Sequence, residues 1–386
     1  MDATHNAAAT PADLAQKLSR LKELSRADPR NQRLARECAD LALQSGDYAL
    51  ALDRLDALLA GSPDDLRARF DRANALIGKR DYPAAIESLR GLVRSNPSLT
   101  AAHINLGLCH YCRAEYAEAR VALDAAYAAG DRSTDLLRLL VSTYHHLGLM
   151  SEAVSLADGN LKAGATDPAL AGVCALAYLD ANQSSKAVRW AGKALAANPN
   201  SVDGLTVQAT VNAARMLTAH AQEQYERVLQ LAPDNGRAWI GLGTLALLRR
   251  DLPKAKAHLA RGLELMPQHV GSWHVLAWSH VISGELDAAD AAFHRALVLN
   301  RNFAETHGGL ASIAALRGDR EGAERGIEVG LRLDPACLSA QFARSVLISR
   351  SGDPAAGTRL IKQTLAKLSP GDGGLLSRVI EQAANQ

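Results

Sequence analysis

Two cysteines and two histidines have the spacing in this chain that could best support chemistry. Cys109 and Cys112 form a CxxC pattern, and His145 and His146 follow further along the chain. Two thiolates and an imidazole can hold zinc, and a CxxC pair can also support redox chemistry. A single CxxC without a second pair is weak evidence, because on a helix such cysteines usually pack. We predict no metal and no cofactor, and keep a metal- or thiol-dependent regulatory or enzyme-accessory role as the alternative.

Other signs of catalysis or of a charged partner are missing from the sequence. No Ser/His/Asp arrangement and no phosphate-binding glycine loop stands out, so we expect a protein that is not an enzyme. The formal net charge of +2 gives no electrostatic case for nucleic acid or an anionic membrane as the partner. No run approaches the roughly 18 apolar residues of a membrane span, and the N-terminus lacks the pattern of a signal peptide. An odd count of five cysteines suits reduced thiols. We therefore expect a cytoplasmic protein without direct membrane insertion.

The elements that would position these side chains are helices that repeat every 34 residues. The 386 residues are 48% hydrophobic but only 4% aromatic, which favours Ala/Leu helix packing. Prolines recur in one register, at Pro29, Pro63, Pro97, Pro199, Pro233, Pro267 and Pro335. A column of small residues shares the period, at Ala51, Ala85, Ala119, Ala153, Ala187, Ala221, Ala255, Ala289, Ala323 and Gly357. A second column holds Ala39, Ala73, Gly107, Val141, Ala175, Ala209, Gly243, Ala277, Ala311 and Ser345. Helix axes about 8–10 Å apart require such small contacts.

The best example of the repeat is the stretch from Gly236 to His269. Its large, small and terminating positions are Trp239, Leu242, Gly243, Ala246, Ala255, Leu259, Gly262 and Pro267. In this pattern the chain resembles the tetratricopeptide repeat (TPR) family. The resemblance implies an all-α fold, a right-handed α-solenoid (superhelix) of tandem antiparallel helix pairs. Trp239 and Trp273 are expected to be packing residues.

The register divides the chain into four predicted parts. Residues 1–10 read as a disordered tail, 11–29 as an N-terminal capping helix, 30–369 as ten repeats and 370–386 as a C-terminal capping helix. The alternative for the last helix is a mobile tail that binds the groove or a partner. Glycines mark most turns within the helix pairs, but Arg215 to Thr218 has none, so a longer or irregular turn is expected there.

Function must then lie on a surface, and the resemblance implies that one face of each first helix lines a concave groove. At 100° per residue this face holds positions 2, 5, 9 and 12 of each repeat. We predict an extended peptide or a partner helix as the ligand, bound by a basic N-terminal mouth and an apolar C-terminal half. The predicted contact residues are Arg33, Arg36, Arg67, Phe70, Asn74, Asn105, Tyr111, Arg138, Arg237, Ile240, Leu247, His274, Trp278, Val281, Phe342 and Val346.

Two other interpretations of this surface stay open. A phase error of one position would return several of the apolar residues to the core. Self-association is also possible, with the apolar groove taking the terminal helix of a second copy, so the chain could form a homo-oligomer. TPR domains that clamp the C-terminal carboxylates of heat-shock chaperones use asparagines together with basic residues. This chain matches the asparagines but lacks the cations, so that ligand is not expected.

Overall fold

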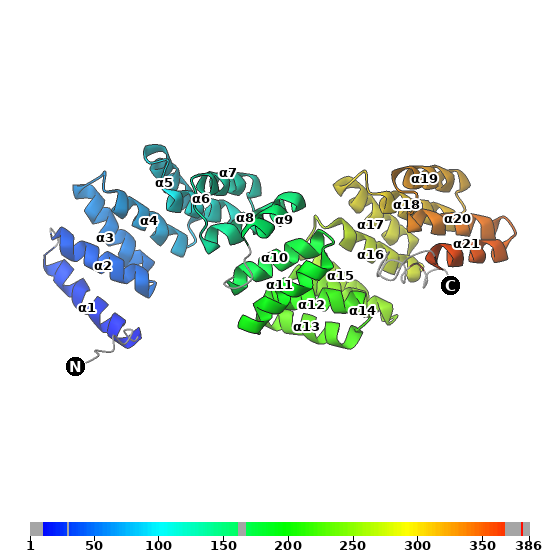
Figure 1. Cartoon of the computed structure of the whole chain (residues 1–386), viewed down its shortest axis with the longest axis horizontal. Helices are drawn as coiled ribbons and strands as arrows, with labels where there is room; N and C mark the ends of the chain where they lie inside the picture. Colours follow the sequence, from blue (N-terminus) through cyan, green and yellow to red (C-terminus); the bar gives the residue numbers. More distant parts are fainter. Residues whose placement is uncertain (1–10, 29–30, 161–166, 367–379, 381–386) are drawn as a thin grey trace. The chain divides into compact units, whose positions relative to one another are not determined.

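The computed structural model describes residues 11–28, 31–160, 167–366 and Ile380, and its regular secondary structure in those ranges is α-helical (Figure 1). The chain falls into two compact units, Met1–Ala181 and Asn182–Gln386. The first unit holds α1 Pro11–Ala27, α2 Gln32–Ser45, α3 Tyr48–Gly61, α4 Leu66–Gly78, α5 Tyr82–Ser95, α6 Thr100–Cys112, α7 Tyr116–Ala128, α8 Thr134–His146, α9 Met150–Asn160 and α10 Pro168–Asp180.

The second unit continues the same alternation of helices. It holds α11 Ser184–Ala197, α12 Val202–Ala214, α13 Thr218–Leu231, α14 Gly236–Leu248, α15 Leu252–Leu265, α16 Val270–Ile282, α17 Leu286–Leu299, α18 Ala304–Arg317, α19 Arg320–Leu333, α20 Leu338–Arg350 and α21 Pro354–Ala366. The predicted tail and the predicted C-terminal helix lie outside the described residues, apart from Ile380.

The small residues of the 34-residue register form the contacts between paired helices. The alanines of the second-helix column, from Ala51 to Ala323, are all fully buried. On the first helices, a Cβ atom added to Gly243 would lie 2.7 Å from Cγ of Leu259, so no larger residue fits there. These contacts confirm the prediction of an α-solenoid built from helix pairs.

Capping residues set where the helices begin, and the left-handed backbone region ends many of them. The side chains of Asp47, Asp81 and Asp251 each accept a hydrogen bond from a backbone N–H in the first turn of the following helix. Gly46 ends α2 with a φ of 78°. Met216 takes the same role with a φ of 62°. The turn from α12 to α13 therefore has ordinary length, and the prediction of a longer or irregular turn is wrong.

Ring N–H groups tie a first helix to the residue that ends the preceding repeat. In each case a side chain near the start of the helix donates to a backbone carbonyl six residues earlier. The pairs are His103 Nε2 with Pro97 O (3.0 Å), Trp239 Nε1 with Pro233 O (2.9 Å), Trp273 Nε1 with Pro267 O (2.9 Å) and His307 Nε2 with Arg301 O (2.8 Å). The backbone carbonyl of the residue that ends one repeat thereby accepts a hydrogen bond from the first helix of the next repeat.

Helices α18 and α20 approach each other unusually closely because small residues face each other. A Cβ atom added to Gly308 would lie 2.4 Å from the backbone nitrogen of Ala340. Ser312 Oγ donates to the carbonyl of Ser339 at 3.0 Å. The carboxylate of Glu305 accepts the backbone N–H groups of Leu338 (2.8 Å) and Ser339 (3.0 Å). Glu305 thus supplies acceptors for the start of α20 from a neighbouring helix.

Candidate interaction surfaces

The predicted contact arginines of the first unit, which are Arg33, Arg36 and Arg67 of the basic mouth and Arg138 further along, are all paired with carboxylates of the same chain. Arg33 Nε lies 3.1 Å from Glu37, and Arg36 forms an ion pair with Asp65. The two remaining pairs join Arg67 to Asp40 (2.8 Å) and Arg138 to Asp135 (3.5 Å). The predicted mouth is therefore charge-balanced, because the acidic residues among the arginines neutralise them. Of the four, Arg33 and Arg67 remain well exposed, at 88% and 63% of their side chains.

The two predicted asparagines meet on neighbouring first helices. Asn105 Nδ2 on α6 donates to Asn74 Oδ1 on α4 at 2.7 Å, and both side chains are half-buried. Each amide keeps one polar atom, Nδ2 of Asn74 and Oδ1 of Asn105, that bonds to no other described residue. Phe70 and Tyr111 on the same helices are also half-buried. This surface, defined by Arg67, Phe70, Asn74, Asn105 and Tyr111, is called the N-terminal face below.

The apolar residues predicted for the C-terminal half of the groove are not a surface. The exposed fractions are 0% for Leu247, 0% for Trp278, 6% for Val281 and 2% for Phe342, and all four belong to one core cluster. The prediction of an exposed apolar face at these residues is wrong. Ile380, also fully buried, belongs to the same cluster. The four side chains thus offer no open apolar groove for the terminal helix of a second copy.

Small residues on α18 explain why this face is closed. The predicted groove positions of α18 include Gly308 and Ser312, which add little bulk between α16 and α20. Trp278 of α16 and Phe342 of α20 therefore reach each other, with ring centroids 5.4 Å apart in an edge-to-face arrangement. Phe293 of α17 packs on Trp278 from another side, at 6.0 Å. Each of these rings is buried by the others instead of by a ligand.

His274 is another predicted groove residue that the fold buries. Its side chain is 5% exposed, and Nε2 shares a hydrogen bond with Thr306 Oγ1 at 2.8 Å. The rings of Phe293 and Phe303 pack edge-to-face against it. Burial lowers the pKa of His274 from its usual 6.5 to about 4, because the charged imidazolium would lose its water. His274 is therefore a neutral link between α16 and α18.

This histidine makes the second unit sensitive to acid. Between pH 6.5 and pH 4 the unfolded histidine binds a proton that the folded one rejects, so stability is complete above pH 6.5 and falls as the pH is lowered. Going from pH 7.5 to 5.0 should cost about 2 kcal/mol through this residue. Thermal unfolding of wild type and of His274→Gln at both pH values measures it. An equal pH response in the two proteins would assign the effect to other groups.

The remaining predicted residues of the second unit are partly accessible. Arg237 and Ile240 of α14 are half-buried, and the Ile240 side chain packs where a Cβ atom on Gly262 would lie, 2.5 Å from its Cδ1. Val346 of α20 is half-buried against the core cluster of Trp278. These three residues therefore line edges of packed helices in the second unit.

The cysteine and histidine candidates are each engaged separately. Cys109 is fully buried, and burial raises the pKa of its thiol to about 12, whereas Cys112 is exposed. His146 stacks on Tyr116 with ring centroids 4.3 Å apart, and His145 Nε2 lies 2.5 Å from Asp180 Oδ2. Among the described residues, no group of three or more His, Cys, Asp or Glu side chains could hold a metal ion. A protonated thiol is a poor metal ligand and nucleophile.

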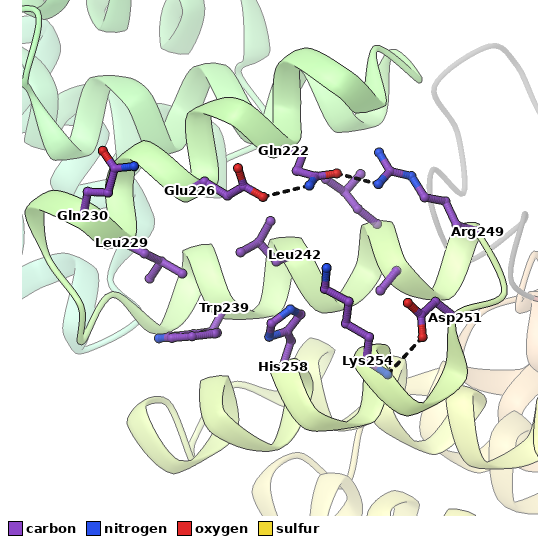
Figure 2. Close-up of a pocket in the computed structure, with 12 residues that line it drawn as sticks. Gln222, Glu226, Leu229, Gln230, Trp239, Leu242, Arg249, Asp251, Lys254 and His258 are labelled. Carbon is purple, nitrogen blue, oxygen red and sulfur yellow. Dashed lines mark hydrogen bonds between the residues drawn. The ribbon is translucent and has the colours of Figure 1, made fainter.

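The structure contains a cleft on the side of α14 away from the predicted groove residues Arg237, Ile240 and Leu247 (Figure 2). The sequence predicted only packing residues on this side. This outer cleft encloses about 410 Å³ and is lined by Gln222, Glu226, Leu229 and Gln230 of α13, Trp239, Leu242, Leu245 and Ala246 of α14, and Arg249, Asp251, Lys254 and His258 around the start of α15. Trp239 and His258 lie side by side in it, with ring centroids 5.2 Å apart. Its floor is apolar and its rim is charged.

Comparison with known proteins agrees with the repeat geometry. A family model described as tetratricopeptide repeat matches residues 36–100 and 70–134, and a second model with the same description matches residues 218–277. Tetratricopeptide repeats are therefore present in both units of the chain. No curated protein matches this TPR protein. Among the solved structures that do, a chain of the crystal structure of the APC/C hetero-tetramer Cut9-Hcn1 is 15% identical, with a TM-score of 0.48, over 91% of this chain and 81% of that chain.

The 34-residue register of the sequence could have predicted the outer cleft of this TPR protein. Two further openings occur at the same register, one lined by Ile86 and Arg90 of α5 and another by Glu324 and Glu328 of α19. Ile86 and Arg90 lie four repeats of 34 residues before Gln222 and Glu226, and Glu324 and Glu328 lie three repeats after them. In the described part of the TPR protein, no helix is both long and apolar enough to cross a membrane.

Proposed function

We propose that this TPR protein is a non-enzymatic interaction scaffold that binds an extended segment of a partner protein on its N-terminal face. The observation that supports the proposal best is the pair of amides on α4 and α6. Asn74 Nδ2 and Asn105 Oδ1 offer one donor and one acceptor side by side. An extended peptide backbone presents the complementary pair, one C=O and one N–H, without regard to its side chains.

The surroundings of the amide pair suit such a ligand. Phe70 and Tyr111 provide half-buried aromatic surface for apolar side chains. Arg67 is exposed, and its ion pair with Asp40 can be exchanged for one with an acidic ligand residue. The buried apolar residues of the second unit are left out of the proposal, because a ligand could reach Trp278 only by unpacking the core.

Removal of both amides should weaken partner binding and leave the fold intact. We expect Asn74→Ala combined with Asn105→Ala to raise the Kd for the partner about tenfold, since each lost hydrogen bond contributes roughly 0.5–1.5 kcal/mol. The partner is first obtained by affinity capture from the native cell and peptide mapping, and the Kd is then measured by calorimetry.

A matched amide elsewhere provides the control. Gln16→Ala removes an exposed amide on α1, outside the N-terminal face, and should leave the Kd unchanged. Circular dichroism should be the same for all three proteins. Equal partner affinity of wild type and the double asparagine variant would exclude the N-terminal face as the binding site.

A further inference from the structure

We propose that the outer cleft is a second docking site, which takes a partner protein segment carrying a large apolar side chain next to a carboxylate. The site lies in the second unit, on α13, α14 and α15, and so is separate from the N-terminal face. It does not rest on the proposed function, because none of its residues belongs to that face.

The apolar half of the ligand follows from the floor of the cleft. Leu229, Trp239 and Leu242 line it, and Trp239 is only half-buried although it is the largest residue type in the chain. Its Nε1–H already donates to Pro233, so the ring needs only apolar contact on its open side. A space of about 410 Å³ accommodates large side chains but is small for a whole helix.

The charged half of the ligand follows from which rim groups are already bonded. Glu226 accepts a hydrogen bond from Gln222 at 2.7 Å, and Arg249 donates to the same Gln222 (Figure 2). The carboxylate of Asp251 accepts the backbone N–H of Lys254 at the start of α15. The Lys254 ammonium itself forms no hydrogen bond or ion pair with any other described residue. Among the ionised side chains of the rim, Lys254 is therefore the one without a hydrogen-bond partner among the described residues.

His258 adds to this selectivity without adding charge. Burial and the neighbouring Lys254 lower its pKa, so the ring beside Trp239 stays neutral at physiological pH. A carboxylate entering near Lys254 thus meets one ammonium without a hydrogen-bond partner in the described part of the chain and one neutral imidazole, while the rim carboxylates of Glu226 and Asp251 already accept hydrogen bonds. A basic ligand residue would instead compete with Lys254 for space and charge.

The other openings at this register lack the open aromatic ring. The opening beside α5 is lined by Pro83, Ile86 and Val93 among others, and the one beside α19 by Ile327 and Leu347 among others, and neither has an aromatic residue in its lining. In the second of these, Arg320 is already paired with Glu324 at 2.9 Å. The combination of an open aromatic ring and an unpaired cation is therefore particular to α13–α15 among these clefts.

Titration of the full chain with short peptides tests the proposal. The probes are the acetylated, amidated heptapeptide AAELFAA and two matched peptides, AAQLFAA without the acid and AAEAAAA without the apolar anchors. The readout is the indole N–H signal of Trp239 by NMR, assigned with Trp239→Phe. We expect AAELFAA to shift this signal, AAQLFAA to bind about fivefold more weakly and AAEAAAA at least tenfold more weakly.

Variants then locate the contact. Lys254→Gln should reduce the affinity for AAELFAA to that for AAQLFAA, whereas Lys362→Gln, which removes an exposed lysine on α21, should change nothing. The proposal is overturned if no peptide shifts the Trp239 signal, if the acid makes no difference, or if Lys254→Gln binds like wild type. Binding of N-acetylphenylalanine as tight as that of AAELFAA would also overturn it, since the cleft would then be a site for small carboxylic acids.

Discussion

Gly308→Ala is expected to destabilise the second unit, although alanine is the better helix former. The added Cβ atom would lie 2.4 Å from the backbone nitrogen of Ala340, 2.8 Å from Cβ of Ser339 and 2.9 Å from Sγ of Cys337. Backbone cannot move aside as a long side chain can, so α18 and α20 must separate. Overpacking of this kind costs about 1–3 kcal/mol, more than the roughly 1 kcal/mol that helix propensity returns. The midpoint of thermal unfolding, followed by circular dichroism, measures the difference.

The chain offers a matched glycine for this experiment. Gly192 lies inside α11 of the same unit, and a Cβ atom added there would meet nothing within 4 Å. Gly192→Ala should therefore raise stability by about 0.5–1 kcal/mol. Opposite signs for the two substitutions would assign the effect of Gly308 to the contact between the helices. If Gly308→Ala were as stable as Gly192→Ala, the close approach of α18 and α20 would not be needed for the fold.

Trp278→Ala and Phe342→Ala should each damage the fold directly. Both rings are buried in the same cluster, and truncating such an aromatic side chain to alanine usually costs about 3–5 kcal/mol. Their edge-to-face contact should appear as a coupling of about 0.5–1.5 kcal/mol in a double-mutant cycle. Urea unfolding of the four proteins gives both quantities, and hydrogen exchange shows whether α16 and α20 lose protection first.

These measurements distinguish burial of Trp278 and Phe342 in the core from their predicted exposure in a ligand-binding groove. A groove surface requires that the double variant keep its helical circular dichroism and stability and lose only its partner. Burial requires that stability fall, whether or not a partner is present. Trp239→Ala is the control, since that ring is half-buried beside the outer cleft and its loss should cost less. Single variants as stable as wild type would restore Trp278 and Phe342 as candidate ligand contacts.

Most of the fold could be predicted because it repeats. A column such as Ala51 to Ala323 states the same contact nine times, so a chance match at one position matters little. The terminating prolines gain their regularity from the same cause, since each ends a helix pair in the same way. The missing glycine between α12 and α13 was misleading because a single residue, Met216, can enter the left-handed region at modest cost when the surrounding helices fix it.

The candidate sites could not be predicted equally well, because exposure depends on which residues lie opposite. Trp278 occupies the same register as Asn74, yet one is fully buried and the other half-buried. The difference comes from Gly308 and Ser312 on a neighbouring helix, which no single-helix period can express. The charge of Arg67 was visible in the sequence, but its pairing with Asp40 required knowing that α2 and α4 lie side by side.

The contact between Trp278 and Phe342 also changes how this region is expected to melt. In a linear array each repeat contacts only its neighbours, so repeats can fray from an end one at a time. Here a ring on α16 touches a ring on α20, with the helix pair α18 and α19 between them in sequence. Fraying α20 would expose Trp278 as well, and opening α16 would expose Phe342. The helices from α16 to α20 are thereby joined into one cooperative block, which opens as a whole or not at all.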